Sequence, residues 1–283
     1  MPALTTDDSR TLAWHESGSG PPMLCHPGGP GCSSEYFGGL PELAQARTLL
    51  LLDPRGTGDS DRPADRSAYD LGHYVADIEA LRDHLGLARI DLLGHSHGGF
   101  VAMAWAGAHP DRVGRLVLAS TAPRFSDAIR TARRARAAEH RDQPYFADAM
   151  AALRAHEAGE YQTDEDLARL FERESRVFAP LGADSGDVRA TLARSGTNAD
   201  ALRHFNEGVA AGMDLAPGLA RSDAPTLVIT GDLDPLGAPA AHELVEALPN
   251  GTLVVVPGDH FPFLEREHRR QWSRAVLEFL ASA

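Results

Sequence analysis

The chain has 283 residues, enough for one large domain or for a core with one insertion, so a sizeable apolar core can form without disulfides or a structural metal. Its 27 basic side chains are outnumbered by 40 acidic ones, which gives a formal net charge of −13. Every basic side chain is an arginine, which excludes chemistry that needs a lysine, such as a Schiff base or a phosphate-binding P-loop. The acidic balance also argues against nucleic acid as a partner, because binding to phosphates needs a clustered basic face.

The first 20 residues are polar. They include Asp7, Asp8 and Glu16 where a secretion signal would have a basic start followed by an apolar run, so no signal peptide is expected. No apolar stretch approaches the ~20 residues that a bilayer span requires. These features predict a soluble, cytoplasmic protein without a membrane partner.

Only two cysteines occur, Cys25 and Cys32. Two are too few for a disulfide framework, and their spacing lacks the partners of a zinc site. We therefore expect both thiols to be reduced. A catalytic Cys25 assisted by His26 is disfavoured, because neighbours on an extended strand point to opposite faces.

Short apolar runs bounded by Gly, Pro or Asp recur along the chain and predict buried parallel strands. These runs are Pro22–His26, Thr48–Asp53, Arg89–Leu93, Arg115–Ala119, Thr226–Thr230 and Thr252–Val256. Helical patterns lie between or after them, at Tyr74–Leu85, Gly98–Ala108, Ala240–Leu248 and Glu265–Leu280. The alternation of strand and helix predicts an α/β protein with a doubly wound, mostly parallel sheet.

The stretch of residues 124–221 breaks this alternation. It contains helical segments rich in Arg, Ala and Glu, such as Asp127–His140 and Thr163–Phe178, and no convincing buried strand. The alternation resumes at Thr226. We interpret residues 124–221 as a helical lid inserted into a core that consists of residues 1–123 and 222–283.

A glycine-rich motif, Gly94–Gly99 with the sequence GHSHGG, follows the expected strand Arg89–Leu93 and opens the expected helix Gly98–Ala108. A strand, a tight G-x-S-x-G turn and a helix form the context of a nucleophile elbow, which holds a serine on a strained turn. The outer glycines of the motif let the two backbones approach closely. Ser96 is therefore the candidate nucleophile, and the alternative is a glycine-rich turn with an idle serine.

A serine hydroxyl needs an imidazole to accept its proton and a carboxylate to orient that imidazole. In this context they follow along the chain in the order Ser, Asp, His. Of the 13 histidines, only His260 lies between the last expected strand and the last expected helix, which makes it the candidate base. Asp232 and Asp234 both follow the strand Thr226–Thr230, and the length of the turn favours Asp234 as the acid. Asp259 is expected to be an exposed loop carboxylate or a helix cap.

The loop His26–Gly31, with the sequence HPGGPG, follows the expected strand Pro22–His26. Negative charge on the oxygen of a tetrahedral intermediate is best stabilised by preorganised backbone N–H groups. Glycines let the backbone approach a substrate closely, and prolines fix the loop. The candidate oxyanion-hole donors are the N–H groups of Gly29 and of His97, the residue after the nucleophile. The alternative is a plain turn from strand to loop.

These residues resemble the α/β-hydrolase superfamily and, within it, the prolyl iminopeptidase family. That family combines an H-G-G-P-G oxyanion loop, a D-x-R-G-x-G-x-S loop and a helical lid. The second motif is complete at Asp53–Ser60, and the first is present with one extra proline. The resemblance covers the sheet domain and implies a serine hydrolase that forms an acyl-enzyme and releases an N-terminal residue from small peptides or amides. We interpret Asp53 and Arg55 as residues that fix their loop rather than contact substrate.

Family members hold the free amino group of a peptide with carboxylates of the lid or rim. Asn206-Glu207 is similar to one such pair, which makes Glu207 a candidate substrate-binding residue; its alternative is a solvated charge of the lid. Two positions depart from the family: Pro235 stands where some relatives have a second glutamate, and His97 where iminopeptidases usually have an aromatic or other side chain. Two alternatives therefore stay open. One is a carboxylester hydrolase of secondary metabolism, and the other is a non-hydrolytic use of the triad, as in a lyase, perhydrolase or receptor.

Other enzyme classes lack a residue that they need. A dinucleotide-binding protein would have a third glycine at Asp61, after Gly56 and Gly58. A metal site at His95 and His97 would need a carboxylate and a further histidine nearby. An epoxide hydrolase or dehalogenase would have aspartate at the nucleophile position. We therefore expect no metal, no organic cofactor, and a small-molecule or short-peptide substrate.

Overall fold

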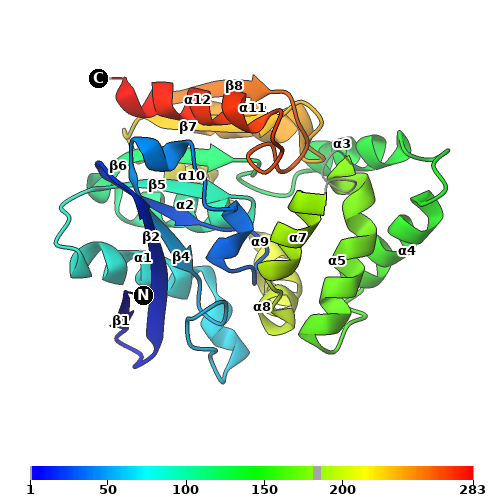
Figure 1. Ribbon diagram of the computed structural model, residues 1–283, viewed down its shortest axis with the longest axis horizontal. Helices are drawn as coiled ribbons and strands as arrows, with labels where there is room; N and C mark the ends of the chain where they lie inside the picture. The colour runs from blue at the N-terminus through cyan, green and yellow to red at the C-terminus, as the bar shows by residue number, and fades with distance from the viewer. Residues whose placement is uncertain (1, 181–185, 283) are drawn as a thin grey trace.

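The computed structural model describes residues 2–180 and 186–282, and its centre is a sheet with the strand order β1-β2-β4-β3-β5-β6-β7-β8 (Figure 1). The strands are β1 Ala3–Thr5, β2 Thr11–Gly18, β3 Pro22–His26, β4 Thr48–Asp53, β5 Ile90–His95, β6 Val113–Ala119, β7 Thr226–Gly231 and β8 Gly251–Val256. The pairs β1–β2 and β2–β4 are antiparallel, and the other pairs are parallel. This arrangement confirms the predicted α/β fold with a mostly parallel sheet.

The inner parallel strands are buried on both faces, as their continuous apolar runs predict. Adjacent residues of a strand enter different cores: Leu92 packs with residues of helices α1 and α2, whereas Leu93 packs with Trp272 of α12. The helices of the sheet domain are α1 Leu71–His84, α2 His97–Ala108, α11 Gly237–Ala247 and α12 Arg269–Ala281, with 3-10 helices η1 Ser34–Phe37, η2 Leu43–Gln45, η3 Arg66–Tyr69 and η4 Pro110–Arg112. Within residues 2–180 and 186–282, no helix is both long and apolar enough to cross a membrane.

The strands β1 and β2 lie in a segment whose sequence indicates only polarity. Both belong to the antiparallel edge of the sheet, where one side of a strand can face water, so neither has the unbroken apolar run of a central strand. In β2 the residues Leu12, Ala13 and Trp14 are buried, and the rest of the strand alternates between half-buried and exposed positions. Because of this mixed composition, the apolar-run pattern does not predict β1 and β2.

Residues 124–221, called the helical insertion from here on, connect β6 to β7. They contain α3 Asp127–Ala138, α4 Phe146–Glu157, α5 Asp164–Phe178, α7 Gly186–Arg194, α8 Ala199–His204, the π-helix η5 Phe205–Val209, α9 Ala210–Gly212 and α10 Ala216–Leu219. Most of their helices stand at one side of the sheet, whereas the last one, α10, lies beside α2 (Figure 1). Part of the insertion has its own small core, formed by Ala152, Tyr161, Leu167, Leu170, Ala199 and Leu202. The expected helices Asp127–His140 and Thr163–Phe178 correspond to α3 and α5, and Thr163 caps α5 through a reciprocal capping box with Asp166.

The helical insertion is joined to the sheet domain through Arg62 and Asn198. The guanidinium of Arg62 donates to Asp164 at 2.7 Å, to Asp200 at 3.0 Å and to the amide oxygen of Asn198 at 3.1 Å. Asn198 is fully buried, and its amide nitrogen donates at 2.9 Å to both the Gly56 carbonyl and the Tyr69 hydroxyl. These bonds fix the start of α8 on the loop that follows β4.

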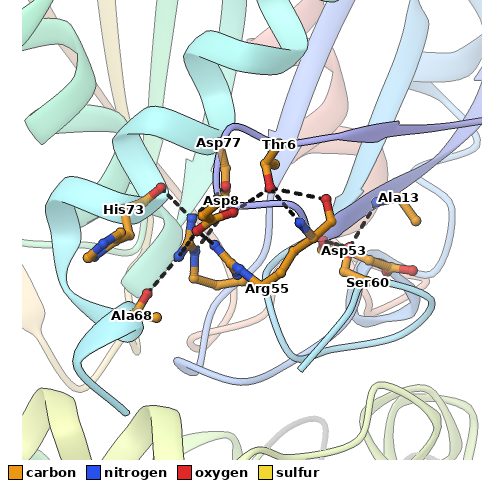
Figure 2. A network of polar contacts seen from close by, with 10 residues as sticks. Thr6, Asp8, Ala13, Asp53, Arg55, Ser60, Ala68, His73 and Asp77 are labelled. Carbon is orange, nitrogen blue, oxygen red and sulfur yellow. Dashed lines mark hydrogen bonds and ion pairs between the residues drawn. The ribbon is translucent and has the colours of Figure 1, made fainter. Parts of the chain in front are cut away.

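The loop after β4 is held by two buried charged side chains (Figure 2). The carboxylate of Asp53 accepts N–H groups of Ser34 at 2.8 Å and Asp59 at 3.0 Å. The guanidinium of Arg55 donates to both carboxylate oxygens of Asp77, at 2.8 and 2.6 Å, and to two backbone carbonyls. Their donors and acceptors are used within the fold, which agrees with the interpretation that they fix this loop.

Replacing Asp77 by alanine is expected to lower the free energy of unfolding by about 3–5 kcal/mol, because the buried Arg55 guanidinium would lose its buried partner and keep only the more exposed Asp8, at 3.8 Å. Urea unfolding measures the change. The matched control is Asp83→Ala on the same helix, whose side chain is 83% exposed; it is expected to change stability by less than about 0.5 kcal/mol. Similar effects of the two substitutions would contradict a structural role for the Arg55–Asp77 pair.

Candidate active site

Ser96 stands on a strained turn between β5 and α2. Its backbone angles are φ 53° and ψ −117°, a region that non-glycine residues rarely occupy and that marks a functional turn. A Cβ atom on Gly94 would lie 2.3 Å from the Gly98 carbonyl oxygen, and one on Gly98 would lie 2.1 Å from the His26 carbonyl oxygen. Only glycine fits at these two positions. The turn therefore has the geometry of a nucleophile elbow.

Asp234 and His260 lie in the loops that follow β7 and β8, and their side chains are in contact. His260 Nδ1 is 3.1 Å from an Asp234 carboxylate oxygen. The Asp234 carboxylate is fully buried, and it also accepts bonds from the Thr230 hydroxyl at 3.0 Å and the Leu236 N–H at 2.9 Å. Burial acts to raise the pKa of Asp234. The electrostatic attraction of His260 and the hydrogen bonds from His260, Ser120 and the Leu236 N–H outweigh this effect, so the pKa is lowered. Asp234 is thus held as a carboxylate beside the imidazole.

The other aspartates of these loops have different surroundings. Asp232 is exposed, and its carboxylate accepts the Gly258 N–H at 3.0 Å, so it joins the two loops, while Asp234 contacts His260. Asp259 is completely buried, which corrects the expectation of an exposed loop carboxylate or a helix cap. Its carboxylate accepts the Phe261 N–H at 2.9 Å. Its side chain also interacts with Glu265, through a side-chain hydrogen bond and by raising the Glu265 pKa.

The two expected oxyanion-hole donors flank the elbow. Gly29 has φ 113°, a conformation that favours glycine, in a loop that lies against the elbow. A Cβ on its neighbour Gly28 would lie 3.1 Å from the Ser96 Cβ. His97 is the first residue of α2, so helix geometry leaves its N–H without an intrahelical acceptor at the positive end of the helix dipole. The assignment of these two N–H groups as an oxyanion hole stays a prediction.

Three buried histidines surround the elbow. Burial lowers the pKa of His26 to about 4 and, together with His260, that of His95 to about 3; burial also holds the pKa of His97 well below its ordinary value. The His97 ring packs against Tyr74 at 5.3 Å and against Phe205 of η5 at 5.2 Å between ring centroids. These imidazoles are neutral at pH 7. They give the elbow an uncharged and largely aromatic surrounding.

Glu207 occupies a different environment from the one expected. Its side chain is 64% exposed and lies 3.8 Å from Arg66, rather than in a pocket that excludes water. The cause is the winding of η5, which turns Phe205 inward and leaves Asn206, Glu207 and Gly208 on the surface. The structure thus favours the alternative interpretation of a solvated charge.

Three side chains that contact the acid or the elbow were not predicted from the sequence. Ser120, buried at the end of β6 with φ 46°, and Thr230, at the end of β7, both donate to Asp234. Tyr36 of η1 is 2.8 Å from a ring nitrogen of His95. Ser120 and Thr230 follow apolar strand runs, which could have marked them as site residues. Tyr36 carries no such local signal.

Within the described ranges, one group of side chains has the spacing of a metal site. His15 Nε2 lies 3.2 Å from an Asp53 carboxylate oxygen and 3.6 Å from one of Asp59. The Asp53 carboxylate already accepts two backbone N–H groups, and the cluster lies on the loop after β4, on residues that fix that loop. We assign no metal to it.

Neither cysteine is a candidate nucleophile. Both are free and buried, and burial raises the pKa of Cys32 to about 11 and that of Cys25 still further. A thiol reacts as its thiolate, so such buried thiols are inert.

A family model described as alpha/beta hydrolase fold matches residues 21–267. The chain therefore belongs to the α/β-hydrolase family and is a hydrolase. Among curated proteins, it is 29% identical to a proline iminopeptidase of Lactiplantibacillus plantarum over 273 residues. The aligned region covers 90% of this chain and 91% of that protein. A proline iminopeptidase of Lactobacillus helveticus is 41% identical, over only 36% of each chain. Among solved structures, a hydrolase from Pseudomonas aeruginosa superposes with a TM-score of 0.74 at 26% identity, covering 99% of this chain and 98% of that one.

The buried histidines predict that the protein loses stability on acidification. A histidine whose pKa is lower in the folded state than in the unfolded state takes up its proton only on unfolding, so stability falls as pH drops below ~6.5. His26, His95 and His97 each act in this direction. Glu265, whose pKa burial and Asp259 raise to about 7, acts in the opposite direction and offsets part of the loss.

We expect the free energy of unfolding to fall by about 3–5 kcal/mol between pH 7 and pH 5. Urea unfolding at a series of pH values measures it. His97→Phe is expected to remove about 2 kcal/mol of that loss, since one titrating group is gone. Stability that is flat over this pH range would contradict the assignment of neutral buried imidazoles.

Proposed function

We propose that Ser96 is the nucleophile, His260 the general base and Asp234 the orienting carboxylate of a serine hydrolase. The observation that carries this proposal is the 3.1 Å contact between His260 Nδ1 and the ionised Asp234. Because Nδ1 faces the carboxylate, Nε2 is the nitrogen that can accept the Ser96 proton. The strained elbow supports the same assignment, since strain of this kind is retained at functional positions.

In this proposal, Ser96 Oγ attacks the substrate carbonyl carbon while His260 Nε2 takes the hydroxyl proton. The N–H groups of Gly29 and His97 stabilise the oxygen that becomes negative. His260 then returns the proton to the leaving amine or alcohol, which leaves an acyl-enzyme on Ser96. A water molecule, activated by the same imidazole, releases the acid. Asp234 stabilises the imidazolium in both halves of the reaction.

Ser96→Ala is expected to keep the fold and to lower kcat by ~10⁴ or more, because no other group can form the acyl-enzyme. Asp234→Asn is expected to be similarly severe, since the amide would mis-orient His260. The matched control is Asp232→Asn, which keeps an acceptor for the Gly258 N–H and is expected to change kcat by less than ~3-fold. Steady-state kinetics on an aryl ester measures all three. A severe loss in the control with a mild one at Asp234 would reverse the assignment of the acid.

We further propose that the substrates are small peptides or amides from which an N-terminal residue is released. The proline iminopeptidase relative matched over 90% of this chain supports this choice. Phe205 of the helical insertion packs on the His97 ring beside the elbow, which connects the insertion to the candidate site. In this proposal the helical insertion, residues 124–221, is the lid that supplies Phe205 to the site.

A second candidate, a carboxylester hydrolase, is favoured by the position of Glu207. An exposed carboxylate beside Arg66 is poorly placed to bind a substrate ammonium, because a pair in water contributes only ~0–1 kcal/mol. An ester without an amino group needs no such partner. A fluorophosphonate-reactive protein that hydrolyses neither substrate class would favour the non-hydrolytic alternatives.

A comparison of free and blocked substrates decides between these candidates. We expect arylamides of proline or alanine to be cleaved, and acetylation of their amino group to abolish cleavage, since an iminopeptidase recognises the free amine. Glu207→Gln is expected to change kcat/KM by less than ~3-fold, as for an exposed charge, with Glu172→Gln on α5 as the control. Equal cleavage of free and blocked arylamides would leave the carboxylester hydrolase. A loss of ~10-fold or more in Glu207→Gln, restricted to free amines, would show that the insertion closes over this carboxylate.

A further inference from the structure

His95, the residue before Ser96, connects the elbow to the loop of His260. Its side chain is completely buried. One ring nitrogen, Nε2, lies 2.8 Å from the backbone carbonyl oxygen of His260. The other, Nδ1, lies 2.8 Å from the hydroxyl of Tyr36. A single side chain thus bridges η1, β5 and the loop after β8.

The partners of His95 define its tautomer. A carbonyl oxygen can only accept a hydrogen bond, so Nε2 carries the hydrogen and donates it to His260. Nδ1 is then an acceptor, and the Tyr36 hydroxyl donates to it. Burial and the neighbouring His260 lower the pKa of His95 to about 3, so the ring stays neutral when His260 takes up a proton. The two ring nitrogens are therefore both satisfied in one fixed arrangement.

The rings of His95 and His260 also pack against each other. Their centroids are 4.8 Å apart with an angle of 62° between the planes. Phe261 packs on both rings, at 5.5 Å from His95 and 5.0 Å from His260. Phe263 lies 4.8 Å from the His95 ring. The backbone bond and the ring contacts thus act on the residue that the proposed function makes the general base.

We propose that His95 is a positioning residue for His260: its Nε2–H holds the His260 carbonyl so that the imidazole keeps Nδ1 on Asp234 and presents Nε2 to Ser96. This inference rests on the proposed function. His95 contacts the backbone carbonyl and the ring of His260, and in this proposal it orients the base without taking part in proton transfer. Tyr36 contributes to the same arrangement, because its hydroxyl donates to His95 Nδ1 and so favours the tautomer with the hydrogen on Nε2. A displacement of a catalytic group by ~1 Å can lower a rate by ~10²-fold, which sets the expected size of the effect.

The test compares His95→Phe, which removes both hydrogen bonds, with His95→Gln, whose side-chain amide can still donate to the His260 carbonyl. Turnover of an aryl acetate is measured per active site, with sites counted by complete fluorophosphonate labelling, so that loss of folded protein does not enter kcat. We expect His95→Phe to lower kcat per site by ~30- to 100-fold with KM changed less than ~3-fold, and His95→Gln to recover most of the loss. A kcat per site within ~3-fold of the parent in His95→Phe, or an equal loss in both variants, would overturn the proposal.

Two further variants keep the test decisive if His95→Phe does not fold. Tyr36→Phe removes only the hydroxyl that selects the tautomer, and it is expected to lower kcat per site by ~3- to 10-fold; an unchanged value would overturn the proposal. Ile78→Val on α1, a fully buried residue of the other core, is the control that lowers stability without changing kcat per site. Ser96→Ala in the same series separates the two hypotheses. If it retains turnover, the proposed function fails, whereas an inactive Ser96→Ala beside fully active His95 variants would refute only the role of His95.

Discussion

The close approach of three backbone segments at the elbow is the constraint on which the site depends. The end of β5, the start of α2 and the carbonyl groups of His26 and Pro27 meet where any side chain on Gly98 would collide with main-chain atoms. That crowding holds Ser96 in a conformation that a serine would not adopt alone. It also brings the Gly28–Gly29 loop against Ser96, so the candidate nucleophile and the candidate oxyanion donors are positioned by the same contact.

The buried titratable groups around the elbow have defined protonation states. His26, His95 and His97 are buried and neutral, whereas Asp234 is buried and ionised because several donors converge on it. A protonated His260 would thus be attracted by the Asp234 carboxylate, and the three neutral imidazoles would not repel it. The same arrangement makes the protein less stable in acid. Each of these histidines binds a proton more readily in the unfolded chain, so low pH favours unfolding.

The sequence was most informative where a residue type is required by local geometry. The glycines of the elbow, the apolar runs of the inner strands and the order Ser, Asp, His predicted the fold, the elbow and the contact between Asp234 and His260. It was least informative where a side chain depends on distant packing. Strand β2 was not predicted because it lies in the antiparallel part of the sheet and has only a short run of buried residues. Tyr36 was not predicted because it is 59 residues away from His95 in the chain. The exposure of Glu207 was not predicted because a π-helical turn determines which side chain of η5 faces inward. Asp259 shows the same limit, since its burial places it beside Glu265, a contact that the local sequence does not indicate.

In the proposed mechanism, Ser96 is the reactive group of this site. The most direct measurement is peptide mapping by mass spectrometry after reaction with a fluorophosphonate, which records which side chain carries the adduct. We expect one adduct, on Ser96, whose formation slows strongly in His260→Ala while the fold is retained. An adduct on another residue, or no adduct on a protein that is folded and hydrolytically active, would contradict it.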